Sequence, residues 1–255
     1  MKAKLFVLLT ILIPSGILFS QTAGDYRSFQ NGLWNDVNTW ERYDGSSWVY
    51  PSPDAPTDAN GILTILNTDT VQIKGIDSVA NLVVNAGGMV FVNGATDTLY
   101  ITAASTVNGY MKFLAGAVRL KTTGSLTFGN GSTLEQASIA SSIPNITWED
   151  GSLLLVTGVL GNTNIGASGG ASYYNITWNC PSQTGNAHMS MHPPTGSYDT
   201  TTTVRGDLNI LSTGVGRAQL CAPAAGTISQ RKISRVVFEG NTNVLNGSVQ
   251  AAHGT

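Results

Sequence analysis

The stretch NLVVNAGGMVFVNG (81–94) decides the fold class, because it joins two short apolar runs through residues that turn the chain. Similar stretches recur as GAVRLKTTGSLTFGNG (116–131), ITWEDGSLLLVTG (146–158) and VRGDLNILSTG (204–214). Their apolar residues alternate with polar ones or form short blocks, which is typical of strands. Each stretch ends at a glycine or at Asn-Gly, where the positive φ of a tight corner is accessible. The repetition predicts an all-β chain built from many short strands and corners.

From Thr64 onward, no segment of ten or more residues has a helical period. The tetrapeptide Asn-Ile-Thr-Trp at 145–148 returns at 175–178, and irregular repeats of about 20–40 residues are typical of solenoids. We therefore predict a right-handed parallel β-helix over 67–255. Tandem β-sandwiches, whose neighbouring strands would be antiparallel, are the alternative. The predicted strands are 62–66, 70–74, 80–85, 89–93, 98–102, 110–114, 117–121, 125–128, 144–148, 152–157, 173–178, 203–210, 217–221, 233–238 and 242–249.

Parallel turns of this kind bury alternate residues of each strand against the turns on either side. The residues predicted to form the core are Leu82, Val84, Val90, Val92, Ile101, Leu120, Leu126, Phe128, Leu154, Val156, Ile176, Leu208, Ile210 and Val237.

The composition favours a folded extracellular β-protein. Charged residues make up 11% of the chain, against about 25% in an ordinary globular domain. The apolar fraction of 42% is sufficient for a core. The net charge is −2 and no basic block occurs, so the electrostatic footprint of a nucleic-acid-binding protein is missing.

The first residues have the pattern of a signal peptide over 1–20. Lys2 and Lys4 precede the apolar run 5–13, and Ser20-Gln21 offers a small-residue cleavage site. A membrane anchor is the alternative, but the apolar stretch is interrupted and shorter than the ~20 residues of a span. We expect a mature chain without a membrane span, either secreted or held at the cell surface.

Residues 21–66 differ from the rest and are predicted to form an aromatic-rich N-terminal cap. They hold three of the five tryptophans, namely Trp34, Trp40 and Trp48. Asp44-Gly45 predicts a hairpin turn between two short strands. Such a segment would cover the open end of a β-coil, whose unpaired edges attract other chains. At the other end, 250–255 follow a predicted strand with no closing element, so we expect the solenoid to be truncated there.

Several segments resemble large repetitive surface proteins that Gram-negative bacteria export through the type IX secretion system. The resemblance covers most of 24–250. It implies a right-handed β-helix and a role at the cell surface, often adhesion; those proteins also carry a C-terminal sorting domain, which this sequence lacks. The segments that carry it are Gly24–Ser28, Asn31-Gly32-x-Trp34, Trp40-Glu41, Asp44-Gly45-x-x-Trp48, Thr70–Ile73, Val79–Gly88, Tyr174–Trp178 and Val204–Ile210.

Aromatic residues are the candidates for ligand contact. Trp148 and Trp178 occupy matching positions of the two Asn-Ile-Thr-Trp segments. If exposed, they would stack on sugar faces together with the loop residues Tyr173, Tyr174 and Tyr198; the alternative is that they pack in the core. The expected partners are surface or extracellular glycans or host proteins, and the expected role is a structural stalk or an adhesin segment.

Arg205-Gly206-Asp207 matches a cell-binding tripeptide, but in a predicted strand we take it as a chance match.

A polysaccharide lyase or glycoside hydrolase is the alternative function, because β-helices commonly host both. Glu149-Asp150 is the only adjacent acidic pair, and strand neighbours point to opposite faces. We find no catalytic constellation and no cofactor fingerprint.

In an extended segment, His188 and His192 would lie roughly 13 Å apart, too far to share a metal ion. Cys180 and Cys221 are either a disulfide or two free thiols.

Overall fold

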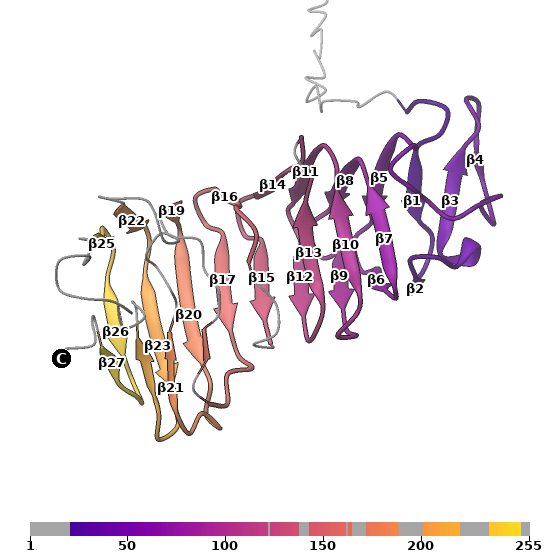
Figure 1. The fold of residues 1–255 in the computed structure, drawn as a ribbon. Helices are drawn as coiled ribbons and strands as arrows, with labels where there is room; N and C mark the ends of the chain where they lie inside the picture. Colours follow the sequence, from indigo (N-terminus) through magenta and orange to yellow (C-terminus); the bar gives the residue numbers. More distant parts are fainter. Residues whose placement is uncertain are drawn as a thin grey trace, which may run out of the picture.

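The computed structural model describes residues 21–121, 123–137, 143–161, 163–164, 172–188, 201–219 and 235–250. Among them, the regular elements are β-strands, apart from the short 3-10 helix η1 (Val37–Thr39). The strands stand side by side in one elongated array, with β3 and β4 at one end and β26 and β27 at the other (Figure 1). The predicted signal peptide (1–20) lies outside the described residues. Among those residues, no helix has the length and apolar character needed to cross a membrane.

The strands form five sheets, which we call A to E. Sheet A consists, in spatial order, of β16 (Thr147–Trp148), β14 (Ser125–Phe128), β11 (Ala104–Val107), β8 (Asn81–Val84), β5 (Ile62–Ile65), β1 (Tyr26–Ser28), β3 (Trp40–Tyr43) and β4 (Trp48–Val49). Sheet B consists of β2 (Gly32–Leu33), β6 (Thr70–Ile73), β9 (Met89–Val92), β12 (Tyr110–Phe113), β15 (Thr133–Gln136), β17 (Leu153–Val156), β20 (Asn175–Asn179), β23 (Leu208–Ser212) and β26 (Thr242–Val244).

The three remaining sheets are shorter. Sheet C holds β13 (Ala117–Leu120), β10 (Thr98–Ile101) and β7 (Ile76–Val79). Sheet D holds β18 (Thr163–Asn164), β21 (Asn186–His188), β24 (Arg217–Gln219) and β27 (Val249–Gln250). Sheet E holds β19 (Ser172–Tyr173), β22 (Thr201–Val204) and β25 (Arg235–Phe238).

The chain visits these sheets in a fixed order. From β5 to β13 it passes through sheets A, B and C in turn, and from β17 to β27 it passes through B, D and E. The pairing among these strands is parallel, so it contradicts tandem sandwiches with antiparallel neighbours. The antiparallel pairs are β1 with β3 and β3 with β4.

The interval between paired strands changes along the chain. In sheet B, Thr70 pairs with Met89 and Met89 with Tyr110, which are steps of 19 and 21 residues. Further on, Leu208 pairs with Ile176 and with Thr242, which are steps of 32 and 34 residues. The longer intervals place extra residues between strands while the pairing stays parallel, and β20 and β23 shift register by one residue after Trp178.

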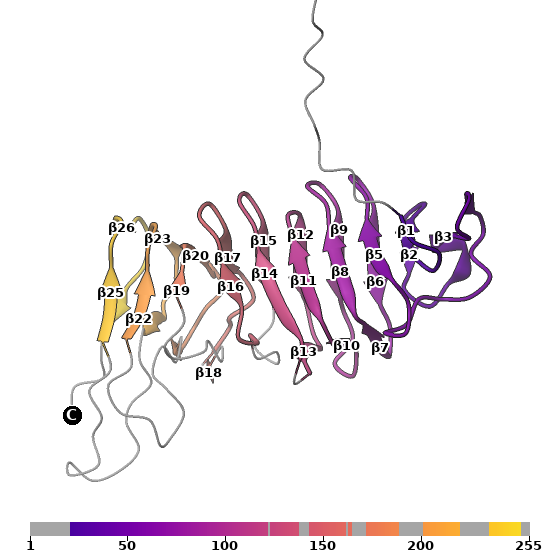
Figure 2. The same ribbon diagram turned by 90° about the horizontal axis from the view of Figure 1, so that it is seen from above.

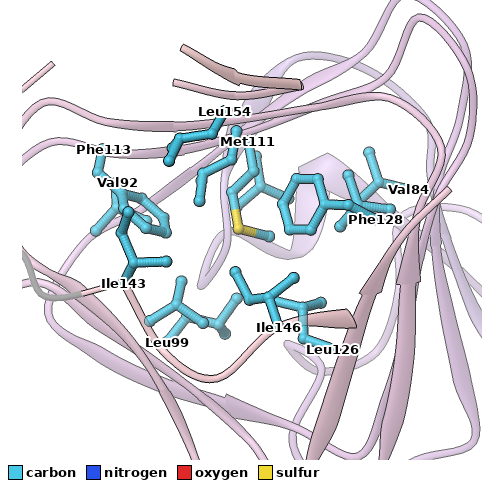
Figure 3. Close-up of a cluster of buried hydrophobic side chains, with 14 of the residues drawn as sticks. Val84, Val92, Leu99, Met111, Phe113, Leu126, Phe128, Ile143, Ile146 and Leu154 are labelled. Atoms are coloured by element: carbon cyan, nitrogen blue, oxygen red, sulfur yellow. The ribbon is translucent and has the colours of Figure 1, made fainter. Parts of the chain in front are cut away.

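The core lies between the sheets. Most strands bury every second residue, so each sheet turns one face inward. Figure 3 shows side chains from three sheets meeting, among them Val84, Leu99 and Met111. The predicted core residues are buried, with two exceptions. Leu120 is partly buried, and Val237 is 39% exposed because Val236 and Phe238 on either side of it face the core instead.

The hairpin predicted around Asp44-Gly45 is present between β3 and β4. Gly45 has a φ of 105°, and the Asp44 carboxylate accepts hydrogen bonds from the backbone of Ser46 and Ser47, both at 2.8 Å. The 21–66 segment is continuous with the long sheets, since β1 pairs in parallel with β5 and β2 with β6.

Candidate functional site

A groove of about 460 Å³ lies on the outer face of sheet A. Its lining comes from β1, β4, β5, β8 and β11, from the corners that follow β5, β8 and β11, and from Gln21 and Asp25, which precede β1. The groove therefore crosses the strands and follows the long axis of the array, along which Figure 2 shows β11, β8, β5 and β1 in succession. The lining residues are Gln21, Asp25, Tyr26, Arg27, Trp48, Ile62, Thr64, Leu66, Val83, Asn85, Thr106 and Asn108.

One column of outward-facing residues forms the floor of this groove. Arg27 pairs with Thr64, Thr64 with Val83, and Val83 with Thr106. These side chains point outward because the residues beside them, such as Leu63 and Val84, are buried in the core. The same column continues beyond the groove through Thr127 and Thr147. Threonine therefore recurs on the neighbouring strands β11, β14 and β16 at ~4.8 Å, whereas Val83 separates Thr64 from Thr106 within the groove.

Arg27 and Trp48 close the N-terminal end of the groove. The guanidinium carbon of Arg27 lies 4.3 Å from the ring centroid of Trp48, and Arg27 Nε donates to the Glu41 carboxylate at 2.5 Å. Tyr43 packs on Trp48 with ring centroids 5.4 Å apart. The tryptophan ring thus contacts both a cation and a second ring, which fixes the end wall.

The two charged lining residues are both engaged within the chain. Asp25 is 5% exposed, and its two carboxylate oxygens accept from the backbone nitrogens of Thr22 and Ile62, both at 2.8 Å. The charge of Arg27 is balanced by Glu41. The open part of the groove consequently presents mainly hydroxyl, amide and aliphatic groups, and none of its described lining residues is an unpaired cation.

The polar groups of the groove make few contacts within the chain. Asn85 and Asn108 follow β8 and β11 at equivalent corners, since their backbone nitrogens donate to Ile65 and Val84. Within the part of the chain that the structure describes, the side chains of Thr64, Thr106, Asn85 and Asn108 show no hydrogen bond. These hydroxyl and amide groups are available to a ligand.

The outer face of sheet B is different, because its polar groups bind one another. The Glu135 carboxylate accepts from Tyr110 at 2.6 Å and from Thr157 at 2.7 Å, and Lys112 Nζ lies 3.0 Å from it. Burial raises the pKa of Glu135, but the three hydrogen bonds and the lysine charge outweigh burial, so its pKa is lowered. This cluster therefore links neighbouring strands of sheet B to one another, and its polar groups already have partners.

The carboxyl group of Asp77 in β7 is expected to make the folding stability depend on pH. Burial and the nearby Asp97 carboxylate raise the pKa of Asp77 to about 6, although a backbone hydrogen bond from Lys74 opposes them. The folded state therefore binds more protons than the unfolded state between about pH 4 and pH 6, and this group lowers stability as the pH rises through that window. We expect Asp77→Asn to be more stable than the wild type at pH 8 by about 1 kcal/mol, since the carboxyl is only half-buried. At pH 4 the two should be equal.

Urea unfolding at pH 4, 6 and 8 measures this difference for the wild type and Asp77→Asn. Parallel stability profiles of the two proteins across the three pH values would contradict the raised pKa. Asp58→Asn, at an exposed position, is the control and is expected to leave the profile unchanged.

The tryptophans predicted to meet sugars are buried instead. Trp148 is 3% exposed, Tyr173 1% and Trp178 0%. Trp148 lies between Phe128 and Tyr173, with ring centroids 5.1 Å and 5.5 Å away. The prediction of glycan contact through these three residues is therefore wrong, because inward positions of their strands place the rings in the core.

Tyr174 is the one of these candidates that is described and partly exposed. The guanidinium of Arg205 lies 5.4 Å from its ring centroid, and Arg205 also pairs with Asp150 and donates to the Trp148 carbonyl. Tyr198 lies outside the described residues. Tyr174 thus belongs to a corner cluster and not to the groove.

The tripeptide Arg205–Asp207 forms a corner between β22 and β23, which divides the predicted strand 203–210. Its acid is used internally, since Asp207 Oδ1 accepts from the Asn241 backbone at 2.9 Å. The Asn175 side chain in turn accepts from the Asp207 backbone at 2.9 Å. The side chains of Arg205 and Asp207 therefore both bond to residues of neighbouring turns.

The remaining candidates concern thiols and metals. Cys180 is buried, its Sγ donates to the Val156 carbonyl at 3.5 Å, and burial raises its pKa to about 11. Cys221 and His192 lie outside the described residues, so the disulfide stays a prediction. No group of three or more potential metal ligands occurs among the described residues.

Comparison with known proteins found no matching family model, no similar curated protein and no similar solved structure. The groove therefore has to be interpreted from its own residues. Sequence reasoning missed it, although Thr-Val in β11 and Thr-Phe in β14 place an outward threonine before an inward apolar residue. The signal is weak because threonine is common in strands.

Proposed function

We propose that the chain is a right-handed parallel β-helix that serves as an exported, non-catalytic surface segment, either a rigid stalk or part of an adhesin. The observation that supports it best is the fixed order of the sheets, with each strand in parallel register with a strand of the next circuit. Parallel crossovers are right-handed in almost all proteins. A repeat of this kind gives a stiff rod, because each turn contacts only its neighbours.

The length of the rod follows from its longest sheet. Sheet B has nine strands, and eight spacings of ~4.8 Å extend over about 38 Å. The side chains that face outward along sheet B differ in size and are mostly uncharged, as in the column Gln72, Phe91, Lys112, Glu135 and Leu155. The signal-like residues 1–20 favour export to the cell surface or the medium.

Several carboxylates in the described residues act as structural acceptors, which also supports a non-catalytic role. Asp97, for example, accepts from the backbone of Gly75 at 2.8 Å and of Gly94 at 2.5 Å. Asp25, Glu135 and Asp207 are likewise engaged by neighbouring turns. A lyase or glycosidase needs acids that converge on a substrate, whereas these acids fix corners and sheet faces.

Export and lack of catalysis are tested on one preparation. The full chain is produced in a Gram-negative bacterium, and the exported material is analysed by mass spectrometry and then incubated with neutral and acidic polysaccharides. We expect an N-terminus at Gln21 and no release of reducing ends. Intact Met1 in the membrane fraction contradicts export, and sustained product formation contradicts the non-catalytic role.

A further inference from the structure

We propose that the groove on sheet A binds a neutral, linear polysaccharide that runs across the strands along the axis of the array. This inference rests on the proposed function, to which it adds a site and a ligand class. It replaces the buried tryptophans as the place of glycan contact. The residues that would contact the chain are Thr64, Val83, Asn85, Thr106, Asn108 and Trp48.

The direction of the groove is the first argument. From β1 through β5 and β8 to β11 it crosses three strand spacings, or about 14 Å at ~4.8 Å each. Thr64 and Thr106 therefore repeat a hydroxyl along the groove, and Asn85 and Asn108 repeat an amide beside them. A linear polysaccharide also presents hydroxyls at a regular step along its length, so one ligand can meet several strands in the same way.

The chemistry of the surface is the second argument. Val83 places an aliphatic group between Thr64 and Thr106, and Ile62 and Leu66 add two more in β5 and directly after it. A sugar ring has the same mixture, with C–H groups on its faces and hydroxyls on its rim. Sites that combine apolar surface with a few oriented polar groups are typical of small-molecule binding. The end wall of Trp48 and Arg27 limits how far the chain extends in one direction.

The charge of the surface selects among polysaccharides. Arg27 is paired with Glu41, and the Asp25 oxygens accept two backbone hydrogen bonds, so the described lining of the groove holds no unpaired cation. A polyanion gains little from such a surface, since attraction between a polyanion and a protein depends on unpaired lysine and arginine. We therefore expect neutral glycans to bind in preference to acidic ones.

The test uses the full chain in affinity electrophoresis through gels that contain laminarin, glucomannan or xylan, with polygalacturonate as the acidic comparison. The variant Thr64→Val/Thr106→Val removes two hydroxyls and keeps the shape of the side chains, and valine is favoured in strands. The matched control is Thr133→Val, an outward threonine on sheet B. Circular dichroism and urea unfolding establish that both variants fold.

We expect at least one neutral polysaccharide to retard the wild type and the Thr133→Val control equally. The double variant should lose affinity by about tenfold or more, because two hydrogen bonds to the ligand are removed. Affinity for oligosaccharides of the retarding polymer should rise with length until the groove is filled. Each of these results supports the proposal.

Three results would overturn the proposal: no retardation by any neutral polysaccharide, equal binding by the double variant, or stronger retardation by polygalacturonate. None of them affects the rod or its export. Release of reducing ends, by contrast, is the outcome that contradicts the proposed non-catalytic function. The two failures are therefore distinguishable.

Discussion

Replacing Trp178 with alanine is expected to destabilise the folded chain by about 3–5 kcal/mol. Trp178 is fully buried in β20, where it pairs with Val156 on one side and Ile210 on the other. Removing the ring leaves a cavity between three successive strands of sheet B. It also removes the Nε1 donor to Gln183 Oε1, at 2.9 Å.

The hydrogen bond and the ring volume are separated by a second variant. Trp178→Phe keeps an aromatic ring but leaves the buried Gln183 oxygen without its donor, which should cost about 1–3 kcal/mol. Gln183 is itself tied to the carbonyls of Gly185 and Arg217, at 2.7 Å and 2.8 Å. It has little freedom to find another partner.

Urea unfolding followed by circular dichroism measures both losses. Thr177→Ala, at the outward position next to Trp178, is the control and should change stability by less than about 1 kcal/mol. A Trp178→Ala protein as stable as Thr177→Ala would show that the ring is not part of the core. If that stable Trp178→Ala protein had also lost glycan binding, unfolding could not explain the loss.

The fold class followed from sequence because the alternation of apolar residues is strict in the strongest strands. Asn81–Val84 and Met89–Val92 bury their second and fourth residues, as the pattern predicts. The strands that sequence reasoning missed include Ile76–Val79, Ala104–Val107 and Thr133–Gln136, which contain Asp, Ser, Thr, Glu or Gln. Their place in the sheets is decided by parallel neighbours and not by their own hydrophobicity.

The candidate site could not be predicted from the same pattern for a related reason. Ala104–Val107 supplies Thr106, one of the hydroxyls of the groove floor, so an unrecognised strand hid part of the column. The tryptophans attracted attention because of their size, but a large ring at an inward strand position is more stable in the core. Whether such a ring faces inward depends on register, and register is fixed only when the sheets pair.

Gly109→Ala should also be strongly destabilising, by about 2–3 kcal/mol. Gly109 lies between β11 and β12, where the chain turns from sheet A to sheet B. A Cβ at this position would lie 2.3 Å from the carbonyl oxygen of Gly88 and 2.4 Å from that of Asn85. Both are backbone atoms of the preceding turn, so relief requires two turns to move apart instead of one side chain to rotate.

Two other glycines separate this clash from effects on the backbone. A Cβ at Gly161 meets no heavy atom within 4 Å, and its φ lies outside the left-handed region, so Gly161→Ala should be neutral or slightly stabilising. A Cβ at Gly131 also has free space, but its φ of 75° makes Gly131→Ala cost about 1 kcal/mol through strain alone. We therefore expect the urea midpoint to be highest for Gly161→Ala, lower for Gly131→Ala and lowest for Gly109→Ala.

The effect of Gly109→Ala should reach the groove, because Asn85 is both the neighbour that is pushed away and a lining residue. If the carbohydrate proposal holds, Gly109→Ala weakens binding under conditions where the protein is still folded, whereas Gly131→Ala does not. A Gly109→Ala protein with wild-type stability would mean that the turns do not approach as closely as the structure requires. The contact of one turn with the next fixes the spacing of the hydroxyls, so stability and the geometry of the groove have the same physical origin.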